Sequence, residues 1–179
     1  KISLMWPIIS KLEQLSGKRY TSHTESMRVI ADHLRAATFM AVDGCIPSNK
    51  EQGYVMRRLL RRAIRYSFDL GIEQNFLEAV VPVIADLYEA DFPEVKSARE
   101  QIIAVLAKEE AFRQTLRKGL KQMQQYGADG LTGAELFTLY DTFGFPVELS
   151  TEEAYKQGIP LSEDWRAEFD AKMAEQRQR

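Results

Sequence analysis

Apolar residues recur at spacings of three and four positions through most of this 179-residue chain, and they almost never alternate with polar residues along a run. A spacing of three to four places side chains on one face of an α-helix, whereas strict alternation is typical of a half-buried strand. Gly and Pro stand between the periodic segments, where they are expected to end helices and form turns. The sequence therefore predicts an all-α fold, a helical bundle.

The longest periodic segment covers residues 94–126 and predicts one helix of unusual length. Such a helix would link two helical sub-domains, which we place at residues 1–93 and 94–179, with the boundary within or after this helix, at about 95–128. Shorter segments predict helices over 6–15, 27–42, 53–66 and 76–89. The segment 27–42 is apolar nearly all round and is expected to be central and buried.

Two capping signatures predict helix starts in the last third of the chain. Thr132 is followed three positions later by Glu135, and Ser150 is followed by Glu153. This is the spacing of a capping box, in which the side chain of each residue bonds the backbone amide of the other. A glycine is expected to end each of these helices, and a last helix is expected to start near residue 162.

The composition limits the kinds of site that the chain can build. With 45% apolar residues the chain can bury a core, and no run approaches the roughly 18 apolar residues of a membrane-spanning helix. One cysteine, Cys45, and two histidines, His23 and His33, give neither an internal disulfide nor a zinc-binding spacing. We therefore expect a cytoplasmic location, no membrane partner, no metal and no catalytic residue, with His33 at the edge of the core. Because the chain starts at Lys1 and stops within a charged helical pattern, we expect a piece of a longer protein.

The segment 53–66 carries five arginines within nine positions, and we call them the arginine face. They are Arg57, Arg58, Arg61, Arg62 and Arg65. On a helical wheel they form one continuous sector opposite an apolar face. The net charge of the chain is only −2, so affinity for an anionic partner must come from such a local cluster.

The arginine face has a single sign of charge. We expect no acidic residue three or four positions away to pair with these arginines, so the like charges repel unless another surface supplies anions. Guanidinium groups favour bidentate recognition of phosphate or carboxylate. The arginine face therefore predicts either a phosphate or RNA surface, or a set of ion pairs within or between domains.

Two stretches resemble sequences of alanyl-tRNA synthetases. Residues 28–66 read RVIADHLRAATFMAVDGCIPSNKEQGYVMRRLLRRAIRY and resemble the segment that follows the class II catalytic domain in that family. Residues 136–149 read LFTLYDTFGFPVEL and resemble a second block further along. The resemblance implies the middle, tRNA-recognition region of the enzyme, which is helical and holds the acceptor stem of tRNA-Ala. It also implies, as partners, the catalytic and editing domains of the same parent chain.

In that family an asparagine and an aspartate read the G·U wobble pair of the acceptor stem, and the matching positions are Asn49 and Asp141. RNA presents a wide, shallow minor groove, where the free guanine 2-amino group of a wobble pair can donate to a carboxylate. An amide offers both a donor and an acceptor. Local alternatives stay open, because Asn49 could form an Asx turn and Asp141 could cap a backbone amide or pair with an arginine.

Other positions depart from the family or lack its chemistry. The family commonly has Gly-Arg before the Gly-Tyr of the loop, where this chain has Glu51 and Gln52, so an arginine expected to contact phosphate is replaced. The parent enzymes use ATP, Mg²⁺ and, in the editing domain, zinc. The motifs for these groups do not appear in this chain, so we expect the fragment to hold no cofactor and to be catalytically inactive.

The sequence leaves two functions open. The first is recognition of the tRNA-Ala acceptor stem, in which Asn49 and Asp141 supply specificity and the arginine face supplies affinity. The second is a helical scaffold whose arginine face docks on an acidic protein surface. The two hypotheses differ in where the arginines find their anions.

Overall fold

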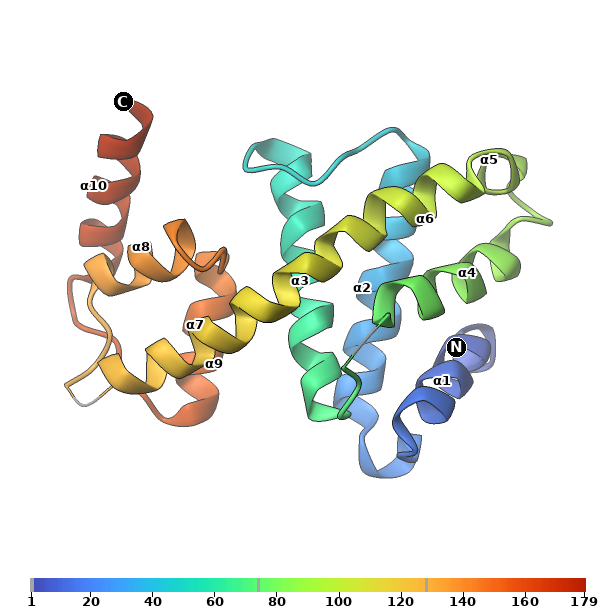
Figure 1. The fold of residues 1–179 in the computed structure, drawn as a ribbon, viewed down its shortest axis with the longest axis horizontal. Coiled ribbons are helices and arrows are strands. Elements are labelled where there is room, and N and C mark those ends of the chain that lie inside the picture. Colours follow the sequence, from blue (N-terminus) through green and yellow to red (C-terminus); the bar gives the residue numbers. More distant parts are fainter. Residues whose placement is uncertain (1, 74, 128) are drawn as a thin grey trace. The chain divides into compact units, whose positions relative to one another are not determined.

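The computed structural model describes residues 2–73, 75–127 and 129–179, most of which lie in helices (Figure 1). Within these ranges the only extended pairing is an isolated parallel bridge between Leu131 and Leu161. The predicted all-α fold is confirmed. The chain divides into two compact units, Lys1–Ala111 and Phe112–Arg179.

The N-terminal unit is built from helices joined by short turns. Its elements are α1 (Ile2–Ser16), η1 (Tyr20–Ser22), α2 (Thr24–Val42), α3 (Glu51–Asp69), α4 (Phe76–Tyr88), α5 (Pro93–Ser97), α6 (Arg99–Ala107) and η2 (Lys108–Ala111). Figure 1 shows α2 and α3 side by side, and this pair forms the most extensive contact of the unit. α6 packs against α2 and α4, while η2 packs against α3.

α2 and α3 place the core and the arginine face. Five apolar side chains of α2 are fully buried, which confirms the prediction for one face of 27–42; they are Met27, Ile30, Ala31, Leu34 and Ala37. Ala36 is exposed and the apolar residues of the last turn are half-buried, so the helix is not buried all round. α3 is two-sided. Its apolar face is buried through Met56, Leu60, Ala63 and Ile64, whereas all five arginines are half-buried. Burial of one apolar stripe against α2 fixes which way the arginines point.

The single long helix predicted over 94–126 is instead divided into segments. α5 and α6 meet at Ala98, and a 3₁₀ turn, η2, separates α6 from α7 (Phe112–Tyr126). A 3₁₀ turn has 3.0 residues per turn instead of 3.6, so a short one changes the direction of side chains while leaving the apolar spacing almost intact. The periodicity could therefore not reveal the break. The compact units divide after Ala111, which lies in the boundary region 95–128 given from the sequence, while the sub-domain bounds given there divide after residue 93.

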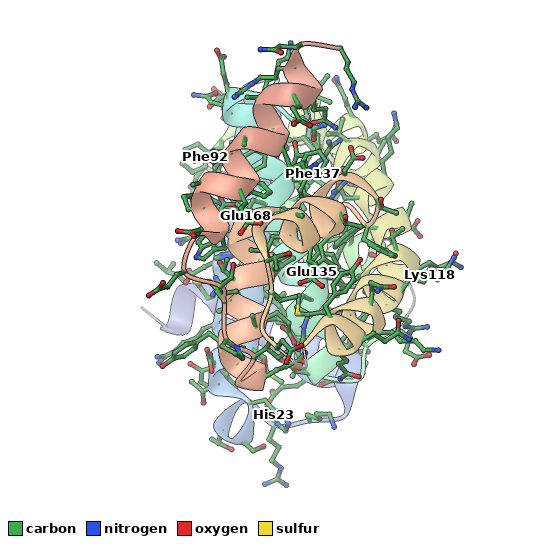
Figure 2. The ribbon with its side chains drawn as sticks, turned by 90° about the vertical axis from the view of Figure 1, so that its left-hand side faces the viewer. His23, Phe92, Lys118, Glu135, Phe137 and Glu168 are labelled. Atoms are coloured by element: carbon green, nitrogen blue, oxygen red, sulfur yellow. The ribbon has the colours of Figure 1, made fainter. Side chains whose placement is uncertain are left out.

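The C-terminal unit consists of α7, α8 (Gly133–Asp141), α9 (Val147–Gln157) and α10 (Trp165–Arg177). α8 packs most extensively against α10, and Figure 2 shows Glu135 and Phe137 of α8 beside Glu168 of α10. This approach requires glycine at Gly133, because a Cβ there would lie 2.3 Å from the Trp165 carbonyl oxygen.

One of the two predicted capping boxes is confirmed and the other is wrong. Thr132 and Glu135 form both reciprocal bonds at the start of α8. α9, however, starts earlier, after Pro146, so that Ser150 and Glu153 lie inside the helix and are buried. Pro146, with a φ of −51° and a ψ of 139°, takes the N-cap position, so α9 starts four residues before the predicted start.

Candidate nucleic-acid interface

The loop between α2 and α3 carries Asn49 and is shaped by a serine and a glycine. The Ser48 amide donates to the Gly53 carbonyl (3.1 Å), and Ser48 Oγ accepts from the Lys50 amide (3.3 Å). A Cβ at Gly53 would lie 2.0 Å from Ser48 Oγ and 2.7 Å from the Ile46 carbonyl oxygen. Glycine is therefore needed for the loop to approach the first turn of α3 this closely, and Asn49 stands exposed on that loop.

The side chain of Asn49 is oriented by Arg57. Arg57 Nη1 donates to Asn49 Oδ1 (2.7 Å), and Arg57 Nη2 donates to the Pro47 carbonyl (3.4 Å). The side-chain turn bond of this loop is made by Ser48. Because its oxygen accepts from Arg57, the Asn49 carboxamide is held with its two N–H donors available to a ligand.

Glu109 of η2 lies between two arginines of α3 and is nearly buried, with 8% of the residue exposed. Its Oε2 accepts from Arg61 Nε at 2.8 Å. Its Oε1 lies 3.4 Å from Arg57 Nε, and since that nitrogen makes no hydrogen bond, the contact is an ion pair only. A buried carboxylate is costly unless it is paired, and here two guanidinium groups pair it.

Arg62 has neighbours on two helices of the same unit. Its Nη1 lies 2.7 Å from His33 Nε2 of α2, and its guanidinium carbon lies 5.1 Å from the centre of the Tyr66 ring. His33 is half-buried, at the edge of the core. Arg58 is half-buried as well and also interacts with other residues.

Arg65 corrects an expectation about the arginine face. α3 continues to Asp69, beyond the predicted segment 53–66, which places an acid four positions after Arg65. Arg65 Nη1 donates to Asp69 Oδ1 at 3.0 Å. The expectation that no acid pairs with an arginine along this helix is wrong here, because the helix is longer than its apolar pattern indicates. Internal ion pairs, one of the two interpretations of the arginine face, are confirmed for Arg57, Arg61 and Arg65.

Asp141 is the last residue of α8 and is exposed. Gln176 of α10, 35 positions later, donates its side-chain amide to Asp141 Oδ1. This glutamine takes the place of the arginine or backbone amide considered from sequence. The C-terminal end of a helix is unfavourable for an anion, so the bond from Gln176 offsets part of that cost. Asn49 belongs to the N-terminal unit and Asp141 to the C-terminal unit.

We also searched the described residues for metal sites, membrane-spanning helices and shifted pKa values. Across residues 2–73, 75–127 and 129–179, no group of three His, Cys, Asp or Glu side chains could hold a metal ion. In that same part of the chain, no helix combines the length and the apolar character needed to cross a membrane. The pKa of Arg99 is raised above its ordinary value by a hydrogen bond to Asp86, with a further contribution from Glu89.

A family model described as "tRNA synthetases class II (A)" matches residues 1–179. The chain belongs to this family of alanyl-tRNA synthetases. It is 43% identical over 98% of its length to an alanine–tRNA ligase of Halalkalibacterium halodurans. Over the same share of the chain it is 41% identical to that of Geobacillus kaustophilus and 44% to that of Levilactobacillus brevis. The chain spans about a fifth (21%) of the length of these relatives.

The departure of the loop from the alanyl-tRNA synthetase pattern has a structural cost. Glu51, at the start of α3, has a φ of +50°. This is the left-handed region, which favours glycine, the residue that the resemblance to the family implies at this position. A side chain in that region costs about 1–2 kcal/mol. Gln52, in place of the family arginine, is exposed at the first turn of α3.

Sequence reasoning missed three residues that hold the candidate interface of this alanyl-tRNA synthetase chain. Asp69 could have been found from its spacing of four positions from Arg65. Glu109 is 48 positions from Arg61 and Gln176 is 35 positions from Asp141. Such long-range pairs leave no local signal in the sequence.

Proposed function

We propose that this chain is the middle, tRNA-recognition part of an alanine–tRNA ligase, and that it binds the acceptor stem of tRNA-Ala. In this proposal the parent enzyme attaches alanine in an ATP-dependent reaction, performed by a catalytic domain outside these residues. The chain itself is then inactive in aminoacylation. The resemblance at 28–66 and 136–149 and the relatives named alanine–tRNA ligase support the proposal.

The observation that carries the proposal is the presentation of Asn49. Its carboxamide is exposed, and Arg57 occupies its oxygen, so that N–H donors are offered outward from a fixed loop. Asp141 complements it, because one carboxylate oxygen accepts from Gln176 and the other can accept from a ligand. We assign to Asp141 the free guanine 2-amino group of the G·U pair, and to Asn49 an acceptor on the same stem.

The arginine face has two assigned tasks in this proposal. Arg57 and Arg61 first hold η2 on α3 through Glu109, and Arg65 pairs with Asp69 within α3. Arg57 also binds the loop through Asn49 and the Pro47 carbonyl. All five arginines, including Arg58 and Arg62, then attract RNA phosphates, which positions the stem without reading its sequence. If about three to five phosphates are neutralised, the logarithm of affinity falls with the logarithm of salt concentration at a slope of roughly −3 to −4.

The experiment measures binding of the chain to acceptor-stem minihelices that carry either G·U or G·C at the wobble position. Asp141→Ala and Asn49→Ala are each expected to lose roughly 1–3 kcal/mol of binding free energy for the G·U stem and little for the G·C stem. Asp170→Ala, an exposed acid on α10, is the matched control and is expected to change neither. Equal affinity of the unmodified chain for both stems would contradict the proposal.

A scaffold is the second candidate, and the internal ion pairs favour it. Glu109 and Asp69 supply anions to three arginines within one unit, so the arginine face has a structural role that needs no RNA. If the chain is a scaffold, it should not retard the G·U or the G·C minihelix in a native gel at low salt. An RNA affinity that does not depend on salt would likewise count against a role of the arginine face in RNA binding.

A further inference from the structure

We infer that Glu109 is a positioning residue for RNA recognition, which acts on Asn49 through Arg57. The inference rests on the proposed function and adds a residue that touches no RNA itself. It also specifies the chemistry that Asn49 recognises, which is a hydrogen-bond acceptor such as a base carbonyl.

The first step is the position of Glu109. It lies in the 3₁₀ turn η2, and only 8% of it is exposed, so it is not placed to contact a nucleic acid. Both of its oxygens are used, one at 2.8 Å from Arg61 Nε and the other at 3.4 Å from Arg57 Nε. The carboxylate is thus fixed on one side by a hydrogen bond and attracts Arg57 on the other.

The second step is the geometry of Arg57. Its Nε is buried and makes no hydrogen bond, so the nearby charge of Glu109 is what compensates that side of the guanidinium. Its two terminal nitrogens point the other way, to Asn49 Oδ1 and to the Pro47 carbonyl. Arg57 therefore bridges a buried acid and an exposed loop, and its planar group can serve both only in this orientation.

The third step is the consequence for Asn49. An amide side chain can turn its oxygen or its nitrogen toward a ligand, and the two choices recognise opposite partners. The 2.7 Å bond from Arg57 selects the orientation with the oxygen inward. Loss of the Glu109 charge is expected to let the Arg57 side chain move. Asn49 would then lose its fixed orientation and its preference for a hydrogen-bond acceptor.

The test compares Glu109→Gln with Asp69→Asn in the 179-residue chain. Both changes remove a carboxylate from the arginine face, but only Glu109 is connected to Asn49. We expect Glu109→Gln to lower the ratio of G·U to G·C minihelix affinity by about five- to tenfold, and Asp69→Asn to leave it unchanged. In an Asn49→Ala background, Glu109→Gln is expected to cause no further loss. An unchanged ratio, or an equal loss in both backgrounds, would overturn the inference.

A second variant covers the case in which Glu109→Gln does not fold. Arg57→Lys keeps a cation beside Glu109, but a single ammonium group cannot hold Asn49 and Pro47 in the same fork geometry. We expect native helical circular dichroism together with the same fall in the affinity ratio. A native spectrum with an unchanged ratio would overturn the inference as well.

NMR of the Asn49 side-chain NH₂ group provides a readout without RNA. Its signal is expected to move toward that of a free amide in Arg57→Lys and to stay in place in Asp69→Asn. If the unmodified chain shows no preference for G·U, the proposed function fails. If the preference exists and survives in Glu109→Gln with an unmoved NH₂ signal, only the inference about Glu109 fails.

Discussion

Gln176, near the end of α10, donates its side-chain amide to the carboxylate of Asp141 at the end of α8. This bond joins the last helix of the chain to the residue proposed to read the guanine amino group. It uses one oxygen and leaves the carboxylate turned in a defined direction. The specificity assigned to Asp141 should therefore depend on a glutamine in another helix.

The first prediction concerns Gln176. Gln176→Ala is expected to weaken binding of the G·U minihelix about two- to twelvefold, because the orienting bond is worth roughly 0.5–1.5 kcal/mol. Gln176→Glu should cost more, since it places two carboxylates together. Gln178→Ala, two positions later, is the control and should have no effect. Equal losses in the alanine variants of Gln176 and Gln178 would remove Gln176 from the interface.

Glu51 provides a prediction about stability. Glu51→Gly is expected to raise the free energy of unfolding by about 1 kcal/mol, because it relieves a side chain at a φ of +50°. Gln52→Gly, at the neighbouring helical position, should instead lower it by up to about 1 kcal/mol. Urea unfolding followed by circular dichroism distinguishes the two. Destabilisation by both variants would argue against strain at Glu51.

Gly53→Ala is expected to destabilise the loop that presents Asn49. Its Cβ would overlap Ser48 Oγ and the Ile46 carbonyl oxygen, and such overpacking costs typically about 1–3 kcal/mol. Because one of the two clashes is with backbone, adding Ser48→Ala should recover only part of the loss. Thermal unfolding of the single and double variants measures this. Full recovery would show that the backbone contact is unimportant.

Substitution of Thr132 and of Ser150 by alanine should have opposite effects on the free energy of unfolding. Thr132→Ala should cost about 1 kcal/mol, because it removes the capping box of α8. Ser150→Ala should be neutral or slightly stabilising, since the buried Ser150 Oγ has no hydrogen-bond partner. Denaturant titration of both variants checks this. A loss of similar size at Ser150 would restore the capping role first predicted from its sequence.

The sequence was sufficient where structure follows from local spacing. The periodic segments located α2, α3 and α4, and the Thr132–Glu135 box located the start of α8. The sequence was insufficient where a tertiary contact determines a helix break or the partner of a side chain. The break at 108–111 leaves the apolar spacing intact, and the partners of Arg61 and Asp141 come from distant segments. The start of α9 differs from the prediction because Pro146 takes the N-cap position that the spacing of Ser150 and Glu153 assigns to Ser150.

η2 carries two consecutive acids with separate tasks. Glu109 faces the arginines of α3, whereas Glu110 accepts from the Leu77 amide at the start of α4. Successive side chains in a 3₁₀ turn differ in direction by about 120°, so neither acid can substitute for the other. An insertion or deletion of one residue within 108–111 would exchange or misdirect both at once. Insertions and deletions should therefore be tolerated far less at this turn than amino-acid substitutions.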